Sequence, residues 1–398
     1  MIDILSKLKN FKFAPENLIY VAFACVFLPY LFTGIIAVGI GLYLLLNPNT
    51  QKQIFVHKGK TLFLLFTAYT AVVAMCYKNY YGLACSAGFF IIIVISYYAR
   101  SVMTEQIFER SLDICAYSAI PVSVAAIIEK LLNSADADYR CKLWFFNENY
   151  FCTLMVAVIL ICAFCATSHK KKVLKYYICA VFAAVALYLG ESIFAFVSLF
   201  VGMFVLLILM RKHTLLAVFL LTVCICLVIL YCVPDIFPRL WESNITTGRR
   251  IRIWNAAMEF IGKEPFFGRG FLSYYQHALE NPSTYQTAHA HNFALEPLIS
   301  FGLVGTALLL IFLWSYYKKV AECKERLRNN YATTFVLTMS AAILVHMTTD
   351  MTIFWIQTGL LYGLILGCVG VDEKALNKRI LACAVSQHSS KTEENING

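Results

Sequence analysis

Long apolar runs follow one another along most of this chain, and they constrain its fold more than any other feature. The chain is 60% hydrophobic, and its mean hydropathy is +0.69, whereas soluble domains are only about half apolar. A run of about 20 apolar residues is long enough to cross a bilayer as a helix, whereas membrane β-strands give alternating segments of about ten residues. The sequence therefore predicts an all-α polytopic membrane protein.

The apolar runs predict about twelve transmembrane helices. The first run, 17–46, is long enough for two short spans that are broken near Pro29 to Gly34. The other predicted spans are 61–77, 79–98, 111–128, 150–168, 175–190, 192–210, 214–233, 293–316, 331–348 and 351–369.

Basic residues predict the orientation of these spans, because Lys and Arg collect in the cytoplasmic loops of membrane proteins. With the N-terminus inside, most of the basic residues fall on the cytoplasmic side, and the main exception is the long loop 234–291. Long loops are translocated largely regardless of charge. We therefore expect a multi-pass protein of the cytoplasmic membrane with both termini cytoplasmic. The net charge of +10 follows from this bias and does not indicate a nucleic-acid partner.

Four regions follow from this pattern. Residues 1–233 form a transmembrane scaffold of about nine spans, and 234–291 form one large external loop that contains short helices. Residues 292–371 supply about three more spans, and 372–398 form a disordered cytoplasmic tail. The external loop is the one long polar interval, so we expect it to be the catalytic part of the chain.

Arginines in the external loop are candidates for binding an anion. Arg249, Arg250 and Arg252 lie close together, and Arg269 follows later in the loop. Guanidinium groups bind phosphate oxygens through two parallel hydrogen bonds and stay charged at any biological pH. These residues are therefore candidates for binding a diphosphate. The alternative is a set of external charges that contact lipid headgroups.

His291 is the candidate general base, because a neutral imidazole at the outer mouth of a span can take a proton from a hydroxyl group. His289 is a weaker candidate of the same kind. A lone histidine is more often structural. Carboxylates at membrane depth are costly and are candidates by default, so we add Glu296, Glu191 and Asp350, which map to the same outer face.

Motifs for other chemistry are absent. The sequence contains no phosphate-binding Walker loop, no HExxH pair and no cluster with metal-ligand spacing. We therefore expect neither a cofactor nor a catalytic metal.

A longer pattern around His291 resembles a known family. His291-Asn292, nine further residues and Gly302-Leu-Val-Gly305-Thr306 match the signature of the O-antigen ligase family of bacterial membrane glycosyltransferases. Upstream segments resemble the GR…W and P-x-x-G-x-G blocks of the same family. Their matching residues are Gly248, Arg249, Trp254, Pro265, Gly268 and Gly270.

The resemblance implies transfer of a glycan from an undecaprenyl-diphosphate carrier to an acceptor hydroxyl at the outer face of the membrane. The family's essential histidine falls on His291, and its essential loop arginine falls on Arg250, with Arg249 as the competitor. Many members have a Ser-Arg pair where this chain has Glu191-Ser192. A carboxylate there would repel a diphosphate, so either other arginines compensate or Glu191 faces the acceptor.

Two subclasses share these features, and a third function competes with them. We slightly favour a polymerase that joins repeat units of a surface polysaccharide. The alternative is a ligase that attaches a finished glycan to a lipid or protein acceptor. We also expect contacts with membrane lipids and possible contacts with other polysaccharide-assembly proteins. The more distant alternative is a flippase or transporter of lipid-linked glycans, which would place charges along a central cavity.

Overall fold

The computed structural model describes residues 14–136, 138–168, 173–241, 243–327 and 329–382, and within them every regular element is helical. The fold is therefore all-α, as predicted. Its α-helices are α2 (Asn17–Cys25), α3 (Tyr30–Leu46), α4 (Pro48–Ile54), α5 (Lys60–Cys76), α6 (Tyr80–Val102), α7 (Glu105–Leu132), α8 (Glu148–Ser168), α9 (Leu174–Gly190), α10 (Ile193–Leu209), α11 (His213–Cys232), α12 (Ser243–Lys263), α13 (Ser273–Glu280), α14 (Leu295–Arg326), α15 (Tyr331–His346) and α16 (Ile356–Gly367), with short 3-10 turns η1 (Pro234–Ile236), η2 (Pro238–Leu240) and η3 (Thr352–Phe354).

The predicted count of about twelve spans is not confirmed. Among the described residues, five helices (α6, α7, α8, α11 and α14) are long and apolar enough to cross a membrane. The count rises to six if α3 and α4, which meet at a bend of 99°, form one span. Helices α5, α9, α10 and α15 are apolar but shorter, and α2 has only nine residues. The predicted segments nevertheless coincide with helices, and the break near Pro29 separates α2 from α3.

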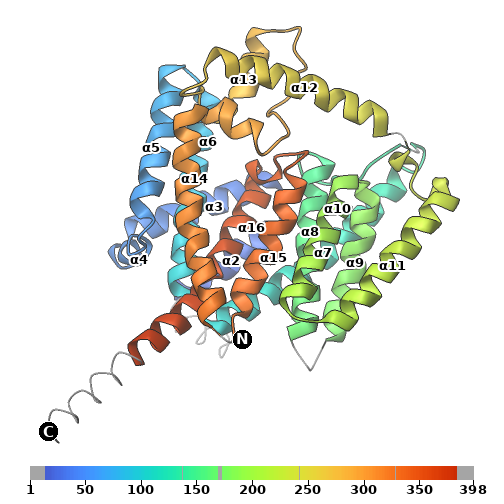
Figure 1. Ribbon diagram of the computed structural model, residues 1–398, viewed down its shortest axis with the longest axis horizontal. Helices are drawn as coiled ribbons and strands as arrows, with labels where there is room; N and C mark the ends of the chain where they lie inside the picture. The colour runs from blue at the N-terminus through green and yellow to red at the C-terminus, as the bar shows by residue number, and fades with distance from the viewer. Residues whose placement is uncertain (1–13, 137, 169–172, 242, 328, 383–398) are drawn as a thin grey trace, which may run out of the picture.

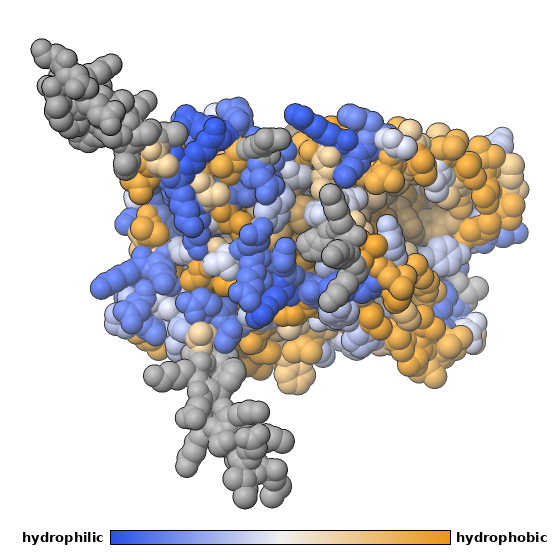
Figure 2. Space-filling view, turned by 90° about the horizontal axis from the view of Figure 1, so that it is seen from below, coloured by the Kyte–Doolittle hydropathy of each residue, from blue (hydrophilic) through white to orange (hydrophobic). Residues whose placement is uncertain are grey.

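Most helices run up and down in one bundle, and α12 and α13 lie across one end of it (Figure 1). We call this the upper end. The connections before α8, between α9 and α10, after α15 and before α14 all lie there. Seen from the lower end, hydrophilic residues cover much of the middle of the surface, and apolar residues gather along one side (Figure 2).

Helix α8 lies at the centre of the main core. It packs against α7, α9, α10 and α15, and side chains along its whole length are buried, among them Phe151, Leu154 and Ile161. Helix α11 is the opposite case, because it buries none of its residues and packs mainly against α10 at the edge of the bundle (Figure 1). The buried helices α8 and α15 therefore provide a rigid support for the upper end.

The segment expected to be a disordered tail begins as a helix. Residues 370–382 are helical, and residues 383–398 lie outside the described part of the chain. Asp372 accepts a hydrogen bond from the backbone N–H of Thr333, and Glu373 accepts one from Arg100 Nε at 2.8 Å. These buried contacts hold the start of the segment against α15 and α6.

Candidate functional site

His291 lies at the upper end in a tight turn, with its backbone in the left-handed region at φ 52°. Its Nδ1 is 3.0 Å from Asp350 Oδ1, and its Nε2 is 2.9 Å from the hydroxyl of Thr287. An ionised carboxylate only accepts hydrogen bonds, so Nδ1 carries the proton and donates it to Asp350. Nε2 is then a free base that accepts a hydrogen bond from Thr287. The imidazole is 21% exposed, so a substrate can reach it.

Asp350 is fully buried at 0% exposure, between α15 and η3. Burial raises the pKa of its carboxyl, but the hydrogen bond and charge of His291, together with His289 and His346, outweigh burial and hold that pKa well below its usual range. Its Oδ2 accepts a hydrogen bond from Asn149 Nδ2. This burial argues against the predicted substrate contact and indicates that Asp350 orients His291.

Asn149 joins the site to the turn between α9 and α10. Its amide donates to Asp350, and its Oδ1 accepts a hydrogen bond from the Ser192 hydroxyl at 2.8 Å. Thr153, one turn later on α8, is 2.9 Å from Nδ1 of the buried His346. Neither Asn149 nor Ser192 stands out in the sequence as a site residue. The adjoining departure from the family pattern at Glu191 was the one signal that pointed to this turn.

His289 is 3% exposed, so the predicted direct contact with substrate does not agree with its burial. Its Nδ1 accepts a hydrogen bond from the backbone N–H of His291, and its Nε2 lies 3.0 Å from the Tyr150 hydroxyl and 3.5 Å from Asp350 Oδ1. Burial, helped by the nearby His291, lowers the pKa of His289 to about 3. His289 is therefore neutral near pH 7 and braces the turn that carries His291.

Glu296 supports the same turn from α14. Its side chain is fully buried, Oε2 accepts a hydrogen bond from the backbone N–H of Ala290, and Oε1 accepts one from the Ser300 hydroxyl. Asn292 caps the start of the helix through the N–H of Ala294. Both residues hold the backbone on either side of His291, and their buried or capping contacts favour a structural role over substrate binding.

Arg250 is the arginine of α12 that reaches the site. Its guanidinium lies 5.1 Å from the ring centre of Phe194 on α10. Burial lowers its pKa, with Asp350 opposing and Arg140 adding to that effect. No described carboxylate forms an ion pair with it. A partly buried guanidinium without an ion-pair partner is suited to binding an anion.

Two arginines that the sequence analysis did not select lie near Arg250. Arg140, from the connection between α7 and α8, donates from Nε and Nη2 to the carbonyl oxygen of Gly190 at 3.2 and 3.1 Å. Arg239 lies in η2, where burial lowers its pKa and the charges of Arg140 and Arg250 lower it further. The three cations therefore come from three separate segments and repel one another.

The other predicted arginines do not join this group. Arg249 is exposed, and Arg252 lies 5.7 Å from the ring centre of Tyr285. Arg269 forms ion pairs with Glu264 and Glu280, each at 2.7 Å. The contacts of Arg269 neutralise its charge and fasten the turn after α12 to α13. This geometry does not support the predicted anion contact by Arg269.

Glu191 ends α9 in the left-handed region at φ 50°. Its carboxylate faces Lys130, whose Nζ lies 3.4 Å from Oε1. The hydroxyl of the next residue, Ser192, points instead to Asn149. The negative charge of Glu191 is therefore partly balanced by a lysine, and it is Ser192 that joins the hydrogen-bonded network of the site.

The two glycine motifs lie directly against each other. Gly302 has a φ of 61° and kinks α14, and a Cβ at this position would lie 2.3 Å from the carbonyl carbon of Phe266. Gly268 also has a positive φ, and a Cβ on it would lie 2.5 Å from the carbonyl oxygen of Ser300. The N–H of Gly270 donates to that carbonyl oxygen at 2.7 Å, and the N–H of Leu303 donates to Pro265. Only glycine permits such close backbone contact.

Gly305 and Trp254 have packing roles. A Cβ on Gly305 would lie 2.3 Å from the ring of Tyr69, so this glycine lets α14 approach α5. Trp254 packs beside a small core formed by α12, α13 and the turn before α14. That core contains Ile253, Ala257, Phe260, Tyr274, Ala278, Ala290 and Ile299.

A metal ion has a possible set of ligands in this site. One ligand atom each from His289, His291 and Asp350 lies within 4.8 Å of the other two. Two imidazoles and a carboxylate are ligands that zinc and other divalent metals accept. The direct hydrogen bond between His291 and Asp350 also satisfies these groups without a metal.

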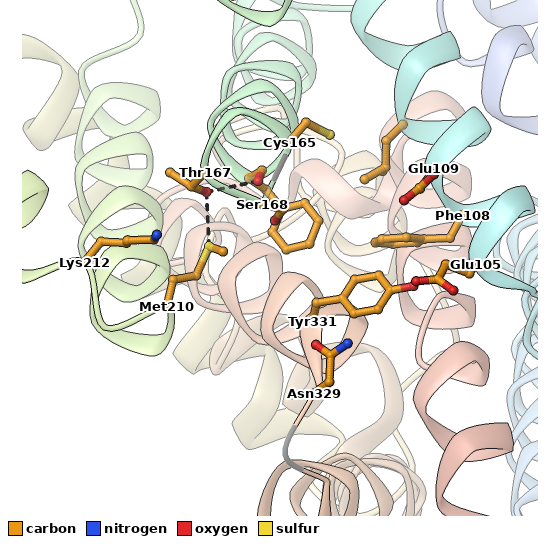
Figure 3. A pocket seen from close by; sticks show the side chains of 12 residues that line it. Glu105, Phe108, Glu109, Cys165, Thr167, Ser168, Met210, Lys212, Asn329 and Tyr331 are labelled. Atoms are coloured by element: carbon orange, nitrogen blue, oxygen red, sulfur yellow. Dashed lines mark hydrogen bonds between the residues drawn. The ribbon is translucent and has the colours of Figure 1, made fainter. Parts of the chain in front are cut away.

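A separate pocket of about 390 Å³ lies at the lower end, between α7, α8, α10 and α15 (Figure 3). Its lining includes Glu105, Phe108, Lys212 and Tyr331. It contains none of the predicted site residues, so the polar network around His291 remains the candidate site.

Comparison with known proteins supports the resemblance seen in the sequence. Residues 178–310 match the model of the O-antigen ligase family, a region that includes Arg250, His291 and both glycine motifs. No curated protein matches the chain. Together with the apolar helices, the match indicates an integral membrane protein of a glycosyltransferase-like class. Residues 178–310 of the chain are thus similar to the O-antigen ligase family.

Proposed function

We propose that the chain transfers a glycan from an undecaprenyl-diphosphate carrier to an acceptor hydroxyl at the outer face of the cytoplasmic membrane. The observation that carries this proposal is that buried Asp350 is bonded to Nδ1 of half-buried His291 and also interacts electrostatically with Arg250. The upper end is then the external side, and 234–291 is the external loop. The basic residues at the lower helix ends, such as Arg100 and Lys175, then face the cytoplasm.

His291 acts as the general base in this proposal. Its free Nε2, now bonded to Thr287, takes the proton of the acceptor hydroxyl as that oxygen attacks C1 of the donor sugar. Asp350 holds the correct tautomer and stabilises the imidazolium that forms. General-base help of this kind contributes about 10²- to 10⁴-fold to the rate.

The arginines act on the leaving group. As the bond between C1 and the phosphate oxygen breaks, its electron pair leaves with the diphosphate, and negative charge grows there. Arg250, with Arg140 and Arg239 nearby, stabilises this charge. The attack and departure occur in one displacement, so the configuration at C1 is inverted. Arg140 thereby supplies a cation beside the α9–α10 turn, where Glu191-Ser192 departs from the family's Ser-Arg pair.

We favour a polymerase over a ligase, and a transfer assay in proteoliposomes separates them. Purified protein and His291→Ala are given a lipid-linked repeat unit without a second acceptor. A ladder of products from the wild type that is lost in the variant supports the polymerase. A single shifted product that forms only after a lipid or protein acceptor is added identifies a ligase. Movement of the lipid-linked unit across the bilayer without any transfer would overturn the enzyme proposal in favour of a flippase.

The role of the arginines has a matched comparison within the chain. Arg250→Ala and Arg140→Ala should raise the KM for the lipid-diphosphate donor or lower kcat, whereas Arg249→Ala should have little effect because Arg249 is exposed. Equal losses in all three variants would indicate a nonspecific effect of surface charge.

A metal-assisted version of the same reaction is the second candidate, because His289, His291 and Asp350 are close enough to share an ion. The metal-free mechanism predicts full activity after treatment with EDTA and dialysis. Loss of activity that Zn²⁺ or Mn²⁺ restores would favour the metal-assisted version.

A further inference from the structure

Four aromatic side chains from three segments gather at the upper end beside the candidate site. The indole of Trp355 is central, with ring centres 5.6 Å from Tyr150, 4.8 Å from Phe146 and 5.1 Å from Tyr30. The indole N–H donates to Gln357 at 2.9 Å, and the Gln357 amide donates in turn to the carbonyl of Leu28. The indole is therefore held in place, with its polar atom already satisfied.

The outer rings of this cluster are open. Phe146 is 58% exposed and Tyr30 is 47% exposed, whereas Tyr150 is buried. Large exposed rings that pack on a fixed indole form an apolar surface that is ready to contact a ligand. We call Tyr30, Phe146 and Trp355 the aromatic platform.

The platform is connected to His291 through Tyr150. The Tyr150 ring is parallel to the indole within 1°, and its hydroxyl lies 3.0 Å from His289 Nε2. The His289 and His291 rings lie 4.2 Å apart. The aromatic cluster therefore contacts the polar network of the site through the buried side chains of Tyr150 and His289.

Arg140 contacts the same network at another point. At the start of α8, Glu148 contacts Arg140. The next residue, Asn149, contacts Ser192 and Asp350. Their neighbours Phe146 and Tyr150 contact Trp355 instead. If the arginines hold the diphosphate, the attacking hydroxyl must reach His291 from a different direction. The platform is linked to His291 through Tyr150 and His289 and not through the arginines.

We propose that the aromatic platform is the acceptor subsite and binds a sugar ring of the acceptor glycan. Sugar rings present an apolar C–H face that stacks on aromatic rings, and polar edges that bond to nearby groups. This inference rests on the proposed function, because it takes the arginine side as the donor side. A lipid contact at the membrane interface, which aromatic residues also favour, is the competing outcome.

The first test measures binding to the two sides separately in the purified full-length protein. One probe is a set of phosphate-free oligosaccharides released by partial acid hydrolysis from the surface polysaccharide of the source cells. The other is undecaprenyl diphosphate. We expect Trp355→Ala and Phe146→Ala to weaken oligosaccharide binding about tenfold, which corresponds to about 1.4 kcal/mol. Binding of undecaprenyl diphosphate should not change.

Matched variants separate this proposal from its alternatives. Trp355→Phe should retain much of the binding, and Tyr80→Ala, which removes another exposed ring at the upper end, should have no effect. Arg250→Ala should lose diphosphate binding and keep oligosaccharide binding, so a failure of the donor assignment can be distinguished from a failure of the platform. If Trp355→Ala does not fold, Phe146→Ala still tests the proposal, because its ring is largely exposed.

Two results would overturn the platform as an acceptor subsite. One is unchanged oligosaccharide binding and acceptor KM in both alanine variants. The other is an effect that appears only as a lower thermal midpoint in lipid nanodiscs, which would assign the rings to lipid contact.

Discussion

At the scale of single residues, the site depends on the hydrogen bonds that fix each protonation state. Asp350 is fully buried and accepts hydrogen bonds from His291 and Asn149, so its charge fixes the proton of His291 on Nδ1. His289 accepts the backbone N–H of His291 on its own Nδ1 and must remain neutral. In the proposed mechanism, Nε2 of His291 is therefore prepared by buried residues that lie behind it.

Asp350→Asn should keep the fold but reduce transfer, because an amide can no longer stabilise the imidazolium and can favour the wrong tautomer of His291. We expect kcat to fall by about 10²- to 10⁴-fold, in the range of general-base contributions, with little change in the KM for the donor. Rates at saturating donor, measured across pH, test this. A large rise in donor KM with unchanged kcat would instead assign Asp350 to substrate binding.

Acid should destabilise the protein through His289. Its pKa is lowered to about 3 by burial, whereas an exposed histidine titrates near about 6.5. Between these values the unfolded chain binds more protons, so stability is present above about pH 6.5 and is lost as the pH falls toward 3. The lowered pKa of Asp350 also reduces stability in acid, at the most acidic end of this pH range. Thermal midpoints in detergent should fall over this window, and His289→Gln should flatten the dependence.

At the scale of elements, the kink in α14 is formed by two glycine motifs that are far apart in the sequence. Gly302 has a positive φ, and the backbone of 265–267 leaves no room for a side chain there, so this position requires glycine. The two segments also form backbone hydrogen bonds with each other. The kink separates the long part of α14 from its short first part, which carries Glu296 and follows His291. The glycines thus position the site without contacting it.

Gly302→Ala should destabilise the protein, because a strained backbone costs about 1–3 kcal/mol and the new Cβ overlaps Phe266. The matched control is Gly262→Ala in α12, where a Cβ meets nothing within 4 Å. That control should be neutral or stabilising by about 0.5–1 kcal/mol, since alanine favours helices over glycine. Thermal unfolding of both variants checks this. Equal midpoints for the two variants would contradict the role of the kink.

At the scale of the whole molecule, the proposed orientation places the candidate site outside and the basic lower end inside. The lower ends of the helices carry Arg100, Lys175 and Lys212, and hydrophilic residues gather on that face (Figure 2). The upper end holds α12, α13 and His291 (Figure 1). A donor on a membrane-bound carrier would then meet the arginines at the outer leaflet.

Labelling of introduced cysteines tests this orientation. In a parent chain whose exposed cysteines are replaced by serine, Lys263→Cys in α12 should react with a membrane-impermeant maleimide in intact cells. Lys58→Cys, near the lower end, should react only after permeabilisation. Both side chains are exposed, so access alone decides the result. The reverse pattern would invert the topology and move the proposed reaction to the cytoplasm.

The sequence alone determined the features that depend on local pattern. Hydropathy predicted the all-α class and the positions of the helices, because each apolar run is continuous along the chain. The spacing from His291 to Gly302 and Gly305 identified the family, because that motif lies in one stretch. The number of membrane spans did not follow as reliably, since α2 has nine residues and α5 and α9 have 17 each, whereas a spanning helix needs about 20.

Only the tertiary structure decided which side chains act together. Asp350 is 59 residues from His291. Arg140 comes from the connection between α7 and α8 and Asn149 from the start of α8, and neither lies in a sequence motif. Arg269 is a candidate by its charge but is neutralised by Glu264 and Glu280. The physical reason is that ionic contacts and burial depend on which segments meet in space. A pattern along the chain records residue types and spacing, whereas partners from distant segments decide whether a charge is free.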